Sequence, residues 1–153
     1  MKTLIGSLLL SIGVVIVSQA APIKQFSPQI QLDGDLSVDK MRKQNLLIVR
    51  KAAEGIGESL PQRVDAYTKL TAVDANGTRL IYTFEVDAGP KSIESMRAKG
   101  HLMAPRILSG ICRSAQRFME ADITLTYRYL ALPSRQEVLR VDANKTKCPE
   151  SLH

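Results

Sequence analysis

The side chains best able to carry chemistry in this sequence are two cysteines and two histidines. Cys112 and Cys148 are the only cysteines, and His153 is the final residue, which leaves His101 as the one internal histidine. A cysteine nucleophile needs its base within hydrogen-bond reach of the sulfur. Cys112 follows His101 by eleven positions, which is about 16 Å of rise along a helix. This spacing argues against a Cys-His catalytic pair.

Other catalytic and metal-binding signatures are missing from the sequence. A transition-metal site needs several His, Cys or carboxylate ligands close together, and two histidines do not supply them. There is neither a Gly-x-Ser-x-Gly nucleophile motif nor a glycine-rich phosphate loop. Paired carboxylates could be drawn from four acids near strand ends: Asp65, Glu85, Glu120 and Asp122. Because acids at strand ends are normally solvated, we predict no catalytic residue, no metal and no cofactor.

The first twenty residues have the pattern of a secretory signal peptide. Lys2 precedes an apolar run from Leu4 to Val17, and Ser18-Gln19-Ala20 is a small-x-small cleavage site. The apolar run is shorter than the roughly 20 residues that a membrane-spanning helix needs, so we favour cleavage after Ala20 over a transmembrane anchor. We expect residues 21–36 to form an extended N-terminal segment and residues 37–153 to form a single domain.

Export bears directly on the two cysteines. Exported proteins reach an oxidising compartment, where paired cysteines form disulfides. We therefore predict a Cys112–Cys148 disulfide, which would stabilise the domain by roughly 4 kcal/mol in the chain-entropy model. A reactive thiol at Cys112 is the alternative.

Hydrophobic periodicity predicts helices and hairpins around these cysteines. Ser37 is a good N-cap for a helix that ends before Pro61, and Asn76-Gly77 favours a tight hairpin turn. The predicted strands are 63–73, 78–86, 122–132 and 137–142, and the predicted shorter helices are 91–99 and 102–113, with a break at 99–101. The order predicts an α+β domain: two helix-plus-β-hairpin halves that form one four-stranded antiparallel sheet, with the helices packed on one face.

The charge is basic but distributed. The chain has 21 Lys and Arg against 15 Asp and Glu, a net charge of +6 that falls to +5 without Lys2. Such mixing indicates a solvated surface with at most weak affinity for anionic surfaces such as acidic polysaccharide or lipid headgroups. Nucleic acid is not an expected partner of an exported chain with no Trp. The basic residues of the first helix, among them Lys40, Lys43, Arg50 and Lys51, are interpreted as a solvated face.

Two groups of residues are candidates for a binding surface. One is the outward side of the third predicted strand: Thr124, Thr126 and Arg128. The other is a basic cluster around the predicted helix break: Arg97, Lys99, His101 and Arg106. Plain solvent exposure is the favoured interpretation of either group. Asn76 and Asn144 also match the N-glycosylation pattern, which matters only in a cell that glycosylates.

The last third of the chain resembles small exported bacterial α+β proteins. The residues that carry the resemblance are Ala104–Cys112, the strand Ile123–Tyr129 and the hairpin that ends at Cys148. Proposed quorum-sensing-regulated secreted virulence factors are proteins of this kind. The resemblance implies a periplasmic or secreted location and brings no catalytic residues with it.

These observations favour an exported, non-enzymatic protein that acts by binding another envelope or secreted protein, as an envelope or virulence-associated accessory factor. The first alternative is an inhibitor or immunity-type partner of a hydrolase, in which an exposed turn such as Asp74–Gly77 would enter a cleft. The second alternative is an enzyme of unrecognised type that uses the scattered acids.

Overall fold

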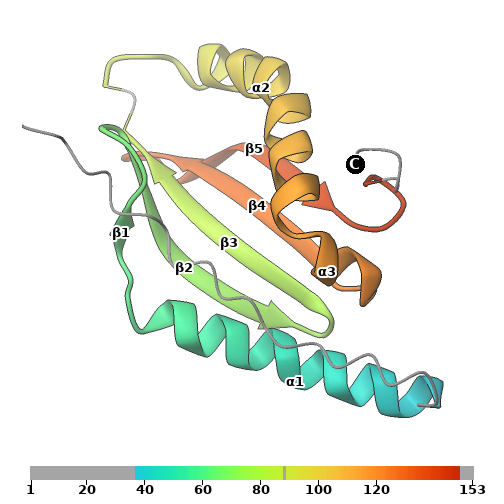
Figure 1. Ribbon diagram of the computed structural model, residues 1–153. Helices are drawn as coiled ribbons and strands as arrows, with labels where there is room; N and C mark the ends of the chain where they lie inside the picture. Colours follow the sequence, from blue (N-terminus) through green and yellow to red (C-terminus); the bar gives the residue numbers. More distant parts are fainter. Residues whose placement is uncertain (1–36, 88, 149–153) are drawn as a thin grey trace, which may run out of the picture.

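The computed structural model describes residues 37–87 and 89–148 (Figure 1). The predicted signal peptide (1–20) and extended segment (21–36) lie outside the described residues. The helices are α1 (Val38–Gly57), α2 (Ile93–Ser114) and α3 (Gln116–Glu120). The strands are β1 (Gln62–Arg63), β2 (Thr68–Asn76), β3 (Arg79–Val86), β4 (Thr124–Ala131) and β5 (Gln136–Ala143).

The strands form one five-stranded mixed sheet in the order β1-β2-β3-β4-β5. β3 and β4 run parallel, and the other neighbouring pairs are antiparallel. The α+β class is correct, but the predicted four-stranded antiparallel sheet is wrong. The segment between β3 and β4 contains α2 and α3, and it returns the chain to the end of the sheet at which β3 began. A crossover of this kind is what parallel neighbours require.

The fifth strand arises because the predicted strand 63–73 is interrupted at Asp65. The Asp65 carboxylate accepts hydrogen bonds from the backbone N–H groups of Tyr67 and Thr68, both at 2.8 Å. Asp side chains commonly hold the backbone two or three residues on in this way. The chain therefore turns, and Arg63 pairs with Lys69 as part of the short strand β1.

Both long helices pack against the same face of the sheet. α1 contributes Val49, Ala52, Ala53 and Ile56 to the core and lies against β2 and β3, whereas α2 lies against β5 (Figure 1). Leu70, Leu80, Ile123 and Leu125 are the largest fully buried apolar side chains on the sheet and the chain leading into it. The core is thus a single layer between the helices and one side of the sheet.

The two short helices predicted on either side of residues 99–101 are one helix, α2. Its Ser92 N-cap hydroxyl accepts the Ser95 N–H, and the helix continues through Gly100 and Pro105. Proline lacks the N–H that would bond to the carbonyl four residues earlier, and it therefore bends a helix rather than always ending it. α2 changes direction along its length (Figure 1), so that its first half lies over the end of the sheet.

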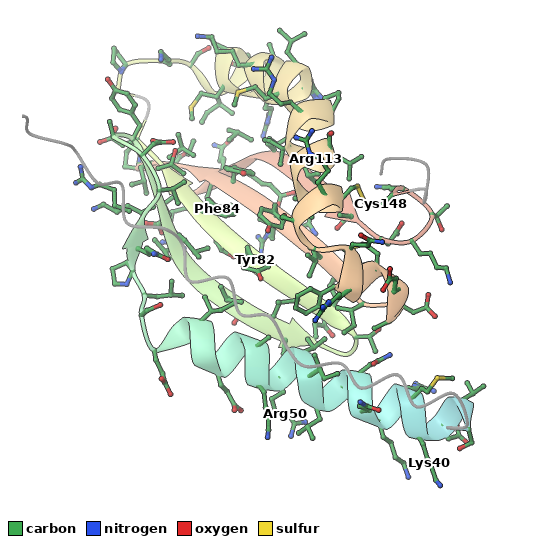
Figure 2. The ribbon with its side chains drawn as sticks, viewed as in Figure 1. Lys40, Arg50, Tyr82, Phe84, Arg113 and Cys148 are labelled. Carbon is green, nitrogen blue, oxygen red and sulfur yellow. A yellow bond between two sulfur atoms is a disulfide. The ribbon has the colours of Figure 1, made fainter. Side chains whose placement is uncertain are left out.

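A disulfide ties α2 to the chain that follows β5. Cys112 and Cys148 are bonded, with their Cα atoms 5.3 Å apart (Figure 2). A backbone hydrogen bond from the Cys148 N–H to the Asn144 carbonyl fixes the turn that brings Cys148 to the helix. The last half of α2 is therefore held both by packing and by a covalent bond.

Candidate functional site

A row of stacked aromatic rings crosses the helix-bearing face of β3 and β4. The parallel register sets Tyr82 opposite Tyr127 and Phe84 opposite Tyr129. The ring centroids are 4.8 Å apart for Tyr82–Tyr127, 5.6 Å for Phe84–Tyr127 and 4.8 Å for Phe84–Tyr129. These spacings are typical of offset stacking. Four of the seven aromatic residues in the chain thus form one continuous surface, and Tyr82 and Phe84 are labelled on β3 in Figure 2.

The tyrosine hydroxyls of this row are held neutral. Burial raises the pKa of Tyr82 to about 12 and that of Tyr129 to about 12. Burial raises the pKa of Tyr127 further, with a contribution from each neighbouring tyrosine. An ionised phenol would lose solvation here, so the neutral form is favoured. The row is therefore a mostly buried stack of rings whose phenols stay neutral to higher pH than an exposed tyrosine would.

A cleft of about 310 Å³ lies where this row meets the first half of α2. We call it the α2 cleft. Its lining residues are Val64, Asp65, Thr68, Phe84, Val86, Lys91, Met96, Lys99, Gly100, Met103, Ile107, Tyr129, Val138 and Leu139. Most of these side chains are apolar, and two are methionines, whose flexible thioethers adapt to irregular partners. Such a surface suits the apolar side chains of a ligand or a partner protein.

The rim of the α2 cleft is polar and mainly basic. Lys91 and Lys99 line it opposite a single acid, Asp65. The cleft adjoins a wider hollow of about 690 Å³ between the β1–β2 turn and the segment after β3, and the two spaces share Asp65, Thr68, Val86 and Lys91. The combined depression is elongated, with an apolar floor at one end and an exposed aromatic ring, Tyr67, at the other.

The structure separates the predicted basic cluster. Lys99 lines the α2 cleft, while His101 and Arg106 are exposed on the same helix. Arg97 instead donates through its guanidinium to the Glu137 carbonyl, with both N–O distances at 3.4 Å. Only Lys99 of this group therefore belongs to the cleft.

The predicted strand group lies on the opposite face of the sheet, where it takes part in a polar network. Thr126 is fully buried and donates to the Asp142 carboxylate at 2.5 Å, and Arg79 bonds both groups at 2.8 and 2.9 Å. Arg128 is half-buried and pairs with the Glu137 carboxylate at 3.0 Å, and Thr124 is half-buried on the same face.

Glu137 links the two predicted groups. Its carbonyl accepts from Arg97, and its carboxylate accepts from Arg140 at 2.9 Å and from Arg128. The hydrogen bond from Arg140, followed by that from Arg128, lowers the pKa of the Glu137 carboxyl below its usual range, although partial burial opposes the shift. The charges on this face thus mainly satisfy one another.

The α2 cleft was not predicted from the sequence, because its lining comes from strands and a helix that are far apart along the chain. The signal was present: aromatic residues occupy alternate positions of two strands, and Met96 and Met103 lie two helical turns apart. Among residues 37–87 and 89–148, no cluster of three His, Cys, Asp or Glu residues could hold a metal. None of the helices in this part of the chain is long and apolar enough to cross a membrane.

The fold occurs in solved bacterial structures, although no family model and no curated protein matches the chain. A candidate secreted protein from Pseudomonas aeruginosa aligns with a TM-score of 0.63 at 16% identity, over 75% of this chain and 100% of that one. The type II secretion system pilotin of Vibrio vulnificus aligns with a TM-score of 0.57 at 11% identity, over 72% and 97%. The corresponding pilotin of Vibrio cholerae gives 0.52 at 10% identity, over the same shares. The TM-scores show a shared fold.

Proposed function

We propose that this protein is an exported, non-enzymatic accessory protein of the bacterial envelope, and that it binds another envelope or secreted protein through the α2 cleft. The observation that carries the proposal is the cleft itself, an open apolar depression with a stacked aromatic floor. Two of the fold neighbours are pilotins of type II secretion systems, and a third is a candidate secreted protein, which agrees with an accessory role.

The lining of the cleft defines the chemistry of the partner. Burying one Leu, Phe or Met side chain of a partner stabilises a complex by about 1.5–3 kcal/mol before ordering costs. Met96 and Met103 on one side and Phe84 on the floor supply the apolar contact. Lys91 and Lys99 at the rim favour an acidic residue close to that apolar segment.

Site-specific photocrosslinking in the native host tests this proposal. p-Benzoyl-phenylalanine is placed at Met103, which is 55% exposed at the mouth of the cleft. The matched control carries it at Lys145, an exposed residue outside the cleft. We expect a single crosslinked envelope or secreted protein at position 103, and loss of that product when Lys99→Glu, at an exposed residue that lines the cleft, is added. The same products at both positions, or none at position 103, would overturn the assignment.

A third crosslinker position separates the inhibitor alternative. The turn between β2 and β3 is Gly77–Thr78, and the exposed residues Asp74–Asn76 are the end of β2, away from the residues of the α2 cleft. A hydrolase captured from Ala75 but not from Met103 would favour an inhibitory turn over the cleft.

A further inference from the structure

The first half of α1 is a helix with no sheet beneath it. Its buried residues begin only at Val49, and its first turns extend beyond the β2–β3 turn (Figure 1). Apolar side chains in this half are exposed: Val38 by 76%, Met41 by 41%, Leu46 by 37% and Leu47 by 50%. A hydrogen bond of 2.6 Å from the Asn45 amide to the Ala121 carbonyl anchors the middle of the helix. The exposed half therefore extends from a fixed point.

The same half of α1 carries most of its positive charge. Residues 38–51 contain five cations and one acid, Asp39. The cations are Lys40, Arg42, Lys43, Arg50 and Lys51, and all are exposed. The ion pairs found among residues 37–87 and 89–148 belong to the sheet and its β4–β5 turn. Lys40 and Arg50 point away from the sheet (Figure 2).

Leu47 lies on this outer face, and Leu46, about 100° away around the helix, lies on its flank. Side chains three or four positions apart are neighbours on a helix. Leu47 therefore lies beside Lys43 and Lys51, and Leu46 lies beside Arg42 and Arg50. Lys and Arg extend their apolar stems along such leucines and place the charge at the polar edge. This is the chemistry of a helix that lies in a membrane interface.

We propose that the outer face of α1 binds the surface of an anionic phospholipid bilayer. A cluster of Lys and Arg near such a surface is attracted to its headgroups, and Leu46 and Leu47 enter the acyl boundary. The face is convex and, among the described residues, belongs to one helix, so it offers no groove of its own to an extended peptide. An acidic polysaccharide would use the cations but leave the two leucines without a role. A fluid lipid surface accommodates both.

Vesicle sedimentation with the full chain after removal of residues 1–20 tests the proposal. One set of vesicles contains equal phosphatidylglycerol and phosphatidylcholine, and the other contains phosphatidylcholine alone. We expect binding to the first set only, weakening as salt rises. Lys40→Gln with Lys43→Gln should lower the partition coefficient about 30-fold, because each cation near the surface contributes about fivefold. The matched control is Lys145→Gln with Lys147→Gln, which should bind as the parent does.

The leucines decide whether the occupant is lipid. Leu46→Gln with Leu47→Gln should weaken vesicle binding by about tenfold or more, while circular dichroism and thermal melting stay unchanged because both side chains are exposed. Parent-like binding of this variant would overturn lipid insertion and indicate a purely ionic partner such as an acidic polysaccharide or protein. No binding to anionic vesicles, or equal losses in the control pair, would also overturn the proposal. Crosslinking at Met103 is independent of these outcomes.

Discussion

Gly100 controls how closely α2 approaches the sheet, and replacing it with alanine tests the geometry of the α2 cleft. The residue is buried in α2 against β5. A Cβ atom at this position would lie 3.2 Å from the Leu139 Cβ and 3.2 Å from the Val138 carbonyl oxygen. Both atoms are fixed to the β5 backbone and have little freedom to move aside. Gly110, in the same helix, has no atom within 4 Å of the equivalent Cβ and provides a matched control.

The two substitutions are expected to change the free energy of unfolding in different directions. Alanine in a helix interior stabilises by about 1 kcal/mol relative to glycine. Overpacking against a fixed neighbour costs about 1–3 kcal/mol. Gly110→Ala should therefore raise the free energy of unfolding by up to about 1 kcal/mol. Gly100→Ala should leave it unchanged or lower it by up to about 2 kcal/mol, because both effects act there.

Thermal melting and urea unfolding of the two variants measure the difference directly. At roughly 4 °C per kcal/mol for a domain of this size, the melting temperatures should differ by about 4–12 °C, with Gly100→Ala the lower. Equal stabilisation of both variants would refute the close approach of α2 to β5 at Gly100. It would also place the first half of α2, and with it Met96 and Met103, farther from the aromatic floor.

Three further outcomes follow from the disulfide, the tyrosines and the polar network. Cys148→Ser should lower the free energy of unfolding, measured in urea, by about 2–4 kcal/mol. Non-reducing mass spectrometry of the exported protein should show Cys112 joined to Cys148, and two free thiols would contradict the structure. Below a pH of about 10, Tyr82 is protonated in both the folded and the unfolded state. Above that pH the unfolded state ionises first, so the free energy of unfolding should fall until the pH reaches the folded pKa of about 12. Tyr82→Phe should lose less stability per pH unit in alkaline urea titrations, and an unchanged pH dependence would contradict burial of this hydroxyl. Thr126→Val removes a hydrogen-bond donor to Asp142 and should lower the free energy of unfolding by about 1 kcal/mol in the same urea assay. The control Thr124→Val should change it by less than about 0.5 kcal/mol. Equal effects of the two variants would argue against the Arg79–Thr126–Asp142 network.

Local patterns predicted local structure well. Period-two alternation located β3 and β4, and Asn76-Gly77 located the turn between β2 and β3, where Gly77 has a φ of +61°. Alternation does not encode the direction of a neighbouring strand, so the parallel pairing of β3 and β4 was not predictable from it. The break expected at Lys99-Gly100-His101 is absent because Gly100 serves tertiary packing there, and packing overrides the low helix propensity of glycine.

The binding candidates show the same limit. Alternation correctly predicted that Thr126 lies on the side of β4 away from the helices. It did not predict that Arg79 and Asp142, from other strands, bond to Thr126 there and that the residue is fully buried. The α2 cleft requires distant segments to meet: the β1–β2 region, β3, α2, β4 and β5. Its two aromatic lining residues, Phe84 and Tyr129, meet because the parallel register sets them opposite each other. No single segment of the sequence contains that information.

The packing of the helices argues against two equivalent halves. In the first half α1 lies against β2, the strand that follows it, and also against β3. In the second half α2 lies against β5, the last strand of its half. A simple repeat would place α2 over β4, where it would cover Tyr127 and Tyr129. Its position over β5, fixed by the Cys112–Cys148 bond and the close approach at Gly100, leaves the cleft that Phe84 and Tyr129 line beside the first half of the helix. The departure from symmetry is therefore what creates the α2 cleft.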